Sequence, residues 1–460
     1  MTDQEIIQSI AEGQERPGYL DEIWHELKFN PKTIVILDDD PTGTQTVHDI
    51  PVITQWTEEV IEKEILNSPV FFILTNSRSL LPGEADNLGR LIGRRLQKAA
   101  AKYNKNLVVI SRSDSTLRGH YPNEVNALAS GLGWNNAKHL LVPAFFEGGR
   151  YTYKDVHYVK EGDAFIPAAE TPFAKDNTFG YASSDLKAWI AEKTKGEVKD
   201  TEVKSLSLDV LRNRPTQAIQ DILNGDTNHY IANATASCDM DAIALAGLRS
   251  TARIIYRTGA SFINAIAGIQ IRPLLEKDTI FTENRSNGGL IVVGSYVPKT
   301  TRQLEYLKKH SKASFIKFDV AKMIRKGSME KELTRIGIEI DHSIQQQSNV
   351  VLYTAREVIK GDTKEESLKI VNQVSQNLIA IIKSLKNKPK YILTKGGITS
   401  SDIAVKALGV KRALVLGQAI KGVPVWRLDE NAKFRELPYI VFPGNVGEDN
   451  ALFTIIQKLT

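Results

Sequence analysis

Short apolar runs alternate with stretches of helical periodicity along most of this 460-residue chain. Ten runs qualify as strands: residues 34–37, 70–75, 107–111, 140–142, 230–232, 290–293, 350–353, 391–394, 414–416 and 439–441. Between two of them, apolar residues recur every three or four positions, the spacing of an amphipathic helix: Leu368, Val371, Val374, Leu378, Ile381 and Leu385. Such alternation is typical of βαβ units. The sequence therefore predicts an α/β fold with largely parallel sheets flanked by helices.

The chain is too long for one hydrophobic core of ordinary size. Residues 276–289 are rich in charged and polar side chains and contain Ser-Asn-Gly-Gly just before the apolar run at 290–293. This composition is typical of a linker. We therefore expect two domains, 1–275 and 290–460, joined by a linker at 276–289.

Composition narrows the classes of partner. The single cysteine, Cys238, excludes an intramolecular disulfide and a cysteine-based zinc site. Residues 1–16 lack the basic region and apolar core of a signal peptide, and no apolar run is long enough to span a bilayer. The net charge of +5 is scattered rather than gathered in a block. We expect a cytoplasmic protein that acts on anionic small molecules and has no membrane or nucleic-acid partner.

Three carboxylates follow the first predicted strand. The run at 34–37 leads into Asp38, Asp39 and Asp40, and Pro-Thr-Gly comes next. Ligands of open α/β sheets bind beyond the carboxyl ends of the strands. Adjacent carboxylates repel unless a cation, a guanidinium or a shared proton relieves them. We expect a binding site here; an acidic turn is the alternative.

A second polar cluster, Ser-Arg-Ser-Asp-Ser-Thr-Leu-Arg-Gly, occupies residues 111–119 after another strand. The guanidiniums of Arg112 and Arg118 match a carboxylate in two parallel hydrogen bonds, and hydroxyls suit a polyol. The cluster therefore predicts a site for a small sugar acid. A capped helix N-terminus with a surface ion pair is the alternative.

Further polar residues follow other strands of the N-terminal half. Arg78 comes just after the run at 70–75, and Arg150 and His157 lie in and after a glycine-rich stretch. A loop histidine is more often structural, although its imidazole can act as an acid or base near neutral pH. We leave the role of His157 open at this point.

The C-terminal half carries three glycine loops after predicted strands. They contain Gly294-Ser295, Gly396-Gly-Ile-Thr399 and Gly444-Asn445. A strand, glycine turn and helix present free backbone N–H groups to phosphate. The ordinary P-loop motif and the kinase-type Gly-x-Gly-x-x-Gly are missing from the sequence. We expect a nucleotide site of another kind, with these candidate residues: Ser295, Gly396, Gly397, Ile398, Thr399, Gly444 and Asn445.

Taken in order, these motifs resemble those of the four-carbon acid sugar kinases, which phosphorylate tetronates such as threonate, erythronate and 3-oxo-tetronate. The resemblance covers nearly the whole chain and rests on these segments: 39–44, 114–119, 143–150, 156–159, 294–295, 396–400, 422–424 and 444–447. The chain departs from the family pattern in three places. Asp38 precedes the usual aspartate pair, Thr44 replaces an alanine, and Ile398 stands where the family often has an acidic or polar residue.

The resemblance implies that the N-terminal domain binds the sugar acid, that the C-terminal domain binds ATP with Mg²⁺, and that the active site lies in the cleft between them. Phosphate would pass to the terminal (C4) hydroxyl. Asp39 is then the expected proton acceptor, and Asp40 orients the hydroxyl or holds Mg²⁺ through water. The implied substrate-binding residues are Asp39, Arg78, Arg112, Asp114, Ser115, Thr116 and Arg118.

Two other functions fit the same residues. The first is a Mg²⁺-dependent phosphatase or lyase of sugar acids, which would have no need of a nucleotide domain. The second is a regulator that binds nucleotide without catalysis, against which the carboxylates beside arginines argue. The sequence leaves open the tetronate and its stereochemistry, and a homodimer is compatible with it.

Overall fold

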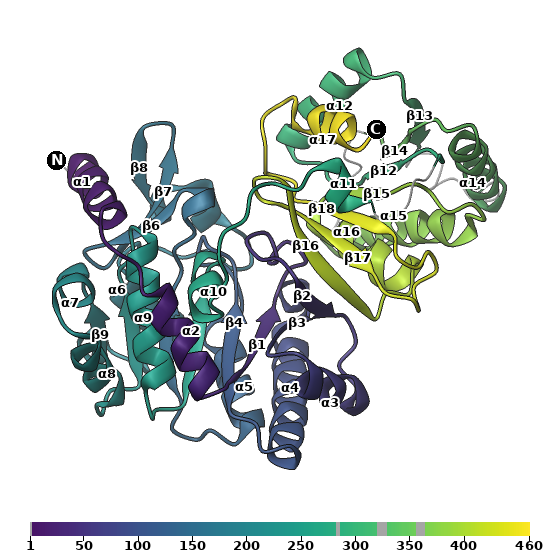
Figure 1. The fold of residues 1–460 in the computed structure, drawn as a ribbon. Helices are drawn as coiled ribbons and strands as arrows, with labels where there is room; N and C mark the ends of the chain where they lie inside the picture. The colour runs from purple at the N-terminus through teal and green to yellow at the C-terminus, as the bar shows by residue number, and fades with distance from the viewer. Residues whose placement is uncertain (1, 282–285, 320–328, 356–363) are drawn as a thin grey trace. The chain divides into compact units, whose positions relative to one another are not determined.

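A computed structural model describes residues 2–281, 286–319, 329–355 and 364–460. The chain forms two compact units, Met1–Ile271 and Arg272–Thr460. Each contains a mostly parallel sheet flanked by helices (Figure 1), which confirms the predicted two-domain α/β architecture. The short helix α11 (Lys277–Ile280) lies in the expected linker at 276–289, of which residues 282–285 are outside the described residues.

The N-terminal unit is built on eight parallel strands. Their order across the sheet is β2 (Ile50–Ile53), β3 (Val70–Leu74), β1 (Thr33–Asp38), β4 (Leu107–Arg112), β11 (Ile254–Thr258), β5 (Lys138–Val142), β10 (His229–Ala232) and β9 (Val203–Leu206). The central strand β1 is buried along its whole length because helices cover both faces. Since all pairs are parallel, the carboxyl ends of these strands lie along one edge.

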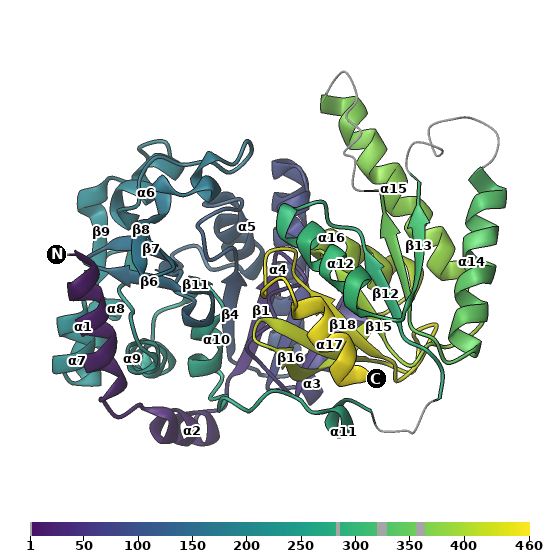
Figure 2. The same ribbon diagram turned by 90° about the horizontal axis from the view of Figure 1, so that it is seen from above.

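Helices pack on both faces of this sheet (Figure 2). On one face lie α3 (Glu58–Asn67), α4 (Pro82–Lys102) and α5 (Asn123–Leu132), whose apolar side chains share a core with β1, β3 and β4. On the other face lie α2 (Leu20–Phe29), α9 (Ser237–Arg249) and α10 (Ser261–Ile266). The remaining helices of the unit are α1 (Thr2–Gln14), α6 (Leu186–Lys193), α7 (Leu208–Asn213) and α8 (Thr216–Asn224).

A separate antiparallel sheet is inserted after β5. It consists of β6 (Arg150–Tyr153), β7 (Val156–Glu161) and β8 (Ala164–Pro167). The sequence analysis had not predicted these strands. Arg150 and His157, noted there as loop residues, belong to β6 and β7.

The C-terminal unit has five parallel strands in the order β13 (Ser314–Phe318), β14 (Val350–Thr354), β12 (Leu290–Val293), β15 (Ile392–Lys395) and β18 (Pro438–Phe442). Two antiparallel strands follow, β17 (Val423–Leu428) and β16 (Arg412–Ile420). Besides α11, the described helices of this unit include α12 (Pro298–His310), α14 (Met329–Gln345), α15 (Lys364–Ser384), α16 (Gly397–Asp402) and α17 (Ala451–Leu459). Helix α12 packs against α17, and α14 packs against α15.

All ten predicted strands are present, although β16 is longer than the predicted run at 414–416. The predicted amphipathic helix is α15, which ends at Ser384, one residue before Leu385. Within the described ranges, no helix is both long and apolar enough to cross a membrane.

Candidate active site

Strand register brings the predicted N-terminal motifs together. Asp38 pairs with Leu74 of β3 on one side and with Arg112 of β4 on the other. Arg112 in turn pairs with Thr258 of β11. The polar residues that follow β1, β3 and β4 therefore meet at the carboxyl edge of the sheet, as the sequence analysis expected.

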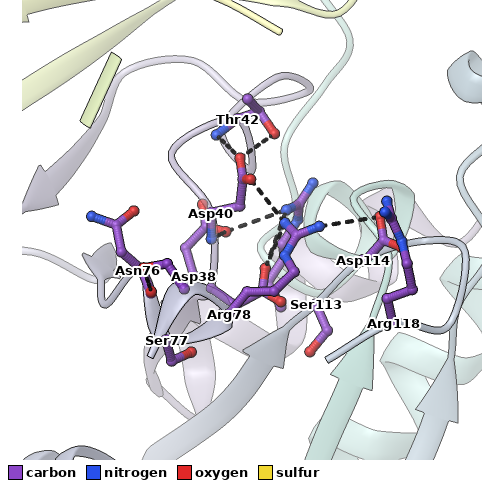
Figure 3. A network of polar contacts seen from close by, with 12 residues as sticks. Asp38, Asp40, Thr42, Asn76, Ser77, Arg78, Ser113, Asp114 and Arg118 are labelled. Carbon is purple, nitrogen blue, oxygen red and sulfur yellow. Dashed lines mark hydrogen bonds and ion pairs between the residues drawn. The ribbon is translucent and has the colours of Figure 1, made fainter. Parts of the chain in front are cut away.

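Arg78 lies at the centre of the cluster (Figure 3). Its Nη2 donates to Asp39 Oδ1 at 3.2 Å and lies 3.0 Å from Asp40 Oδ2, and its Nη1 is 3.5 Å from Asp114 Oδ1. These contacts join the two predicted acidic motifs through one guanidinium. The side chain of Arg78 is 18% exposed, so this guanidinium is shielded but open to a ligand.

A second guanidinium stabilises the base of the cluster. Arg112 Nη1 lies 3.3 Å from Asp38 Oδ1 and 3.9 Å from Asp39 Oδ1, and both Arg112 and Asp38 are buried. Gly43 folds over the Asp38 carboxyl so closely that a Cβ there would lie 1.9 Å from Oδ2. Only glycine fits this turn, because any side chain would collide with Asp38.

The loop after β4 is held by its own polar groups. Arg118 Nε donates to Asp114 Oδ2 at 2.8 Å, and the Thr116 hydroxyl donates to the same oxygen. Arg118 Nη1 also lies 3.5 Å from Asp176 Oδ2. The backbone carbonyl of Ser115 is 2.8 Å from His157 Nε2. Asp114, Ser115, Thr116 and Arg118 are thus brought into one loop beside Arg78.

His157 is completely buried and supports this loop. Its Nδ1 is 3.0 Å from the Thr152 hydroxyl, and its Nε2 faces the Ser115 carbonyl. Burial lowers the pKa of His157 to about 4. A neutral imidazole with both nitrogens engaged positions the loop; we find no free nitrogen on it for acid or base chemistry among the described contacts.

The sequence analysis missed a further ion pair beside the site. Arg257 of β11 donates from Nε to Glu124 Oε1 at 2.8 Å and from Nη2 to the Arg118 carbonyl at 3.0 Å. The Ser113 hydroxyl also donates to Glu124 Oε1. An arginine inside an otherwise apolar run, Ile254 to Thr258, was the available signal, because a buried charge requires a partner.

The three adjacent aspartates have different acidities. Burial, reinforced by the neighbouring aspartates, raises the pKa of Asp38 to about 8 despite Arg112. Burial also raises the pKa of Asp39, to about 6, although Arg78 and Arg112 oppose it. For Asp40, burial is outweighed by Arg78 and by hydrogen bonds from Thr42, so its pKa is lowered. At neutral pH Asp38 is therefore protonated, while Asp39 and Asp40 are ionised.

Asp39 has the one carboxylate oxygen of this trio that is buried without a partner. Among the described residues, nothing donates to Asp39 Oδ2. Both oxygens of Asp40 are occupied, Oδ1 by the amide and hydroxyl of Thr42 and Oδ2 by Arg78. Asp39 is thus the carboxylate of the trio with an oxygen that has no partner among the described residues.

A metal site built from several side chains is absent from the residues that the structure describes. Within the described ranges no group of three or more histidine, cysteine, aspartate or glutamate side chains could hold a metal ion. Asp40, the expected metal residue, contacts Thr42 through Oδ1 and Arg78 through Oδ2, and its role toward Mg²⁺ stays a prediction. We assign no protein ligand to Mg²⁺.

The glycine loops of the C-terminal unit converge. A Cβ on Gly294 would lie 2.2 Å from Thr399 Oγ1, and a Cβ on Gly444 would lie 3.0 Å from Ser295 Oγ. Gly396, with φ of +119°, brings its backbone so close to Ser295 that a Cβ would be 2.9 Å from the Ser295 Cβ. These contacts join the turns after β12, β15 and β18 into one backbone-lined cradle.

A cavity of about 320 Å³ opens beside the first two turns. Its glycine side includes Gly294, Ser295 and Gly396–Thr399, and its apolar wall is formed by Ile370, Val374, Leu378 and Ile403. Ile398 lines it and is 62% exposed. Gly444 and Asn445 do not line this cavity. The amides of Gly294, Ser295 and Gly396 donate to backbone carbonyls, and helix α16 begins at Gly397. An apolar slot next to the first turn of a helix suits a flat base joined to phosphates.

Comparison with known protein families matches a different family model to each of the two units of the chain. Residues 34–266 match the family model of a sugar-binding N-terminal domain, and residues 290–452 match that of a nucleotide-binding C-terminal domain. The chain belongs to the four-carbon acid sugar kinase family. The chain is similar to the D-erythronate kinase of Heliobacterium modesticaldum. The two are 24% identical over 410 residues, which cover 85% of this chain and 87% of the relative.

Two solved structures have the same fold as this chain. A Salmonella typhimurium LT2 protein described as a putative tRNA synthase matches with a TM-score of 0.68 and 15% identity, over 92% of this chain and 98% of its own. A Haemophilus influenzae protein matches with a TM-score of 0.63 and 16% identity, over 92% and 99%. At these identities the likeness concerns the fold alone.

Proposed function

We propose that the protein is an ATP-dependent kinase that phosphorylates the terminal (C4) hydroxyl of a four-carbon sugar acid. The observation that supports this most directly is the unpartnered Oδ2 of Asp39, held among guanidiniums in the unit that matches the sugar-binding model. D-erythronate is the first acid to test, because the relative in Heliobacterium modesticaldum is a D-erythronate kinase.

Asp39 is the proposed proton acceptor. With a pKa of about 6 it is ionised at neutral pH, and its Oδ2 is free to take the proton of the attacking hydroxyl. A bond forms between the oxygen of the substrate hydroxyl and the γ-phosphorus of ATP. The bond between the γ-phosphorus and the β–γ bridging oxygen breaks, and ADP leaves. Arg78 neutralises negative charge on Asp39, Asp40 and the transferred group, which is what phosphoryl transfer mainly requires.

The C-terminal glycine turns are the proposed ATP site. The Gly396 amide already donates to the Phe442 carbonyl, so the amides of the first turn of α16, from Gly397 onward, would hold phosphates. The cavity walled by Val374, Leu378 and Ile403 would take the base. Mg²⁺ bound to ATP would supply charge neutralisation at the phosphates, where such ions commonly have few protein ligands.

Coupled ADP release with Mg-ATP tests the proposal. The panel is D- and L-erythronate, D- and L-threonate and the 3-oxo acids, with each product checked for phosphate at C4. We expect turnover of at least one acid at about 1 to 1,000 per second. Release of inorganic phosphate from the 4-phospho acids without nucleotide would instead support the phosphatase. ATP binding with no turnover of any acid would support the regulator.

A further inference from the structure

The guanidiniums that the sequence analysis assigned to the substrate carboxylate are already paired with protein carboxylates. Arg112 Nη1 lies 3.3 Å from the Asp38 carboxyl and 3.9 Å from the Asp39 carboxylate, and Arg118 faces Asp114 and Asp176. Arg78 holds three carboxylates at once, those of Asp39, Asp40 and Asp114. A substrate carboxylate would have to compete with each of these internal anions.

Arg150 is different. It begins β6, and its guanidinium carbon lies 5.6 Å from the centre of the Phe173 ring, which Arg118 also contacts, at 5.2 Å. In the described part of the chain Arg150 forms no ion pair with any carboxylate, and this is what separates it from Arg112, whose Nε is likewise buried without a hydrogen-bond partner. Its Nη1 donates only to the backbone carbonyl of Gly148.

The electrostatic setting of Arg150 agrees with a missing anion. Burial lowers the pKa of Arg150, and the more distant Asp114 and Glu161 do not compensate. For Arg78 and Arg118, burial is outweighed by adjacent aspartates, and their pKa values are raised. A partly buried guanidinium without a counter-ion is costly, and the cost is recovered when an anion binds.

We propose that Arg150 binds the carboxylate of the acid substrate. This inference rests on the proposed function and adds the residue that recognises the substrate carboxylate. Contacts run from Arg150 through Phe173, Arg118, Asp114 and Arg78 to Asp39, so Arg150 belongs to the same network of side chains. Arginine suits the role because its planar fork pairs with both carboxylate oxygens.

The test compares Arg150→Met and Arg150→Lys with Lys160→Met, a control that removes an exposed positive charge from the neighbouring strand β7. Calorimetry measures the affinity for D-erythronate and for D-erythronamide, an uncharged analogue of equal length. For Arg150→Met we expect erythronate affinity to fall by about 10- to 100-fold with little change for the amide, as loss of charged hydrogen bonds predicts. Arg150→Lys should lie between, and Lys160→Met should match the wild type.

Kinetics provide the second readout. Arg150→Met should raise KM for the acid while kcat at saturation stays within about threefold, because uniform binding is lost. If Arg150 only supports the turn at Gly148, the variant should lower the melting temperature and weaken acid and amide alike, which would overturn the inference. Unchanged acid preference would overturn it too.

The two proposals can fail separately. If the wild type binds erythronate but does not phosphorylate it, the proposed function fails, and the calorimetric comparison still decides the role of Arg150. If the wild type phosphorylates an acid whose binding ignores Arg150→Met, only the role of Arg150 is refuted. If no four-carbon acid binds to the wild type, both are refuted.

Discussion

Three aspartates in sequence have three different environments. Asp38 lies under Gly43 against Arg112, Asp39 keeps one oxygen free, and Asp40 is held by Thr42 and Arg78. One protonated and two ionised carboxyls reduce the repulsion that three adjacent charges would cause. The position of each oxygen, rather than the residue type, thus distinguishes a proton acceptor from its supports.

The acidity of Asp39 predicts the pH dependence of activity. Because the acceptor must be ionised, kcat/KM should fall about tenfold per pH unit below about pH 6. The measurement is kcat/KM from pH 5 upward with the best acid of the panel.

Asp39→Asn should remove most of the turnover and little of the binding. We expect kcat to fall by about 100-fold or more while KM for the acid changes by less than about fivefold. An Asp39→Asn enzyme that keeps nearly all of its kcat would exclude Asp39 as the base.

The raised pKa of Asp38 predicts a change of stability with pH. The folded state holds this proton up to about pH 8, whereas an unfolded aspartate releases it near its ordinary pKa of 3.8. The stability that Asp38 contributes is therefore complete below about pH 4 and is lost as the pH rises toward about 8. The side chain of the Asp38→Asn variant does not titrate. The free energy of unfolding of this variant, relative to that of the wild type, should therefore increase as the pH rises. Urea unfolding of both proteins from pH 5 to 8 measures this; a constant difference would contradict the assignment.

At the scale of elements, the buried strands of the two large sheets could be predicted from the sequence, whereas the strands of the small antiparallel sheet could not. The apolar runs of β1, β3, β4 and β15 are buried, and such runs bounded by polar residues are recognisable in a sequence. The strands β6 to β8 mix aromatic, charged and half-exposed positions and give no such signal.

Pairing between distant residues could not be predicted either. That Arg257 faces Glu124, and that Arg112 and Arg118 face aspartates, depends on strand register and loop closure. The sequence analysis correctly grouped the motifs of the candidate site at one sheet edge. It could not tell which guanidinium remains without an anion, because that follows from all the pairs together.

The turn after β15 yields an element-scale prediction. In Gly396→Ala the residue would keep a positive φ, and its Cβ would lie 2.9 Å from the Ser295 Cβ, which is a steric clash. The variant should therefore displace the glycine turns and raise KM for ATP by about tenfold or more. Gly409→Ala is the matched control, since Gly409 also has a positive φ but open space around its Cβ position. Nucleotide affinity measured by calorimetry should fall in the first variant only. Equal losses in both would attribute the effect to backbone strain alone.

At the scale of the whole molecule, the proposed function gives the two units separate binding tasks. Sugar-binding and nucleotide-binding models match different units, and each unit has its own apolar core. Substitutions should therefore separate the two affinities. Asp39→Asn should leave the dissociation constant of a non-hydrolysable ATP analogue within about twofold, and Gly396→Ala should do the same for erythronate. Loss of both affinities in either variant, measured by calorimetry, would contradict this separation.

The small sheet β6–β7–β8 has its own hydrogen-bond ladder beside the eight-stranded one, and it carries both Arg150 and the loop-supporting His157. A change of side chain in this insert leaves the pairing of the large sheet untouched. If Arg150 selects the acid, the insert is a place where evolution or directed mutagenesis can alter which acceptor is used while the phosphate chemistry on the main sheet is inherited unchanged.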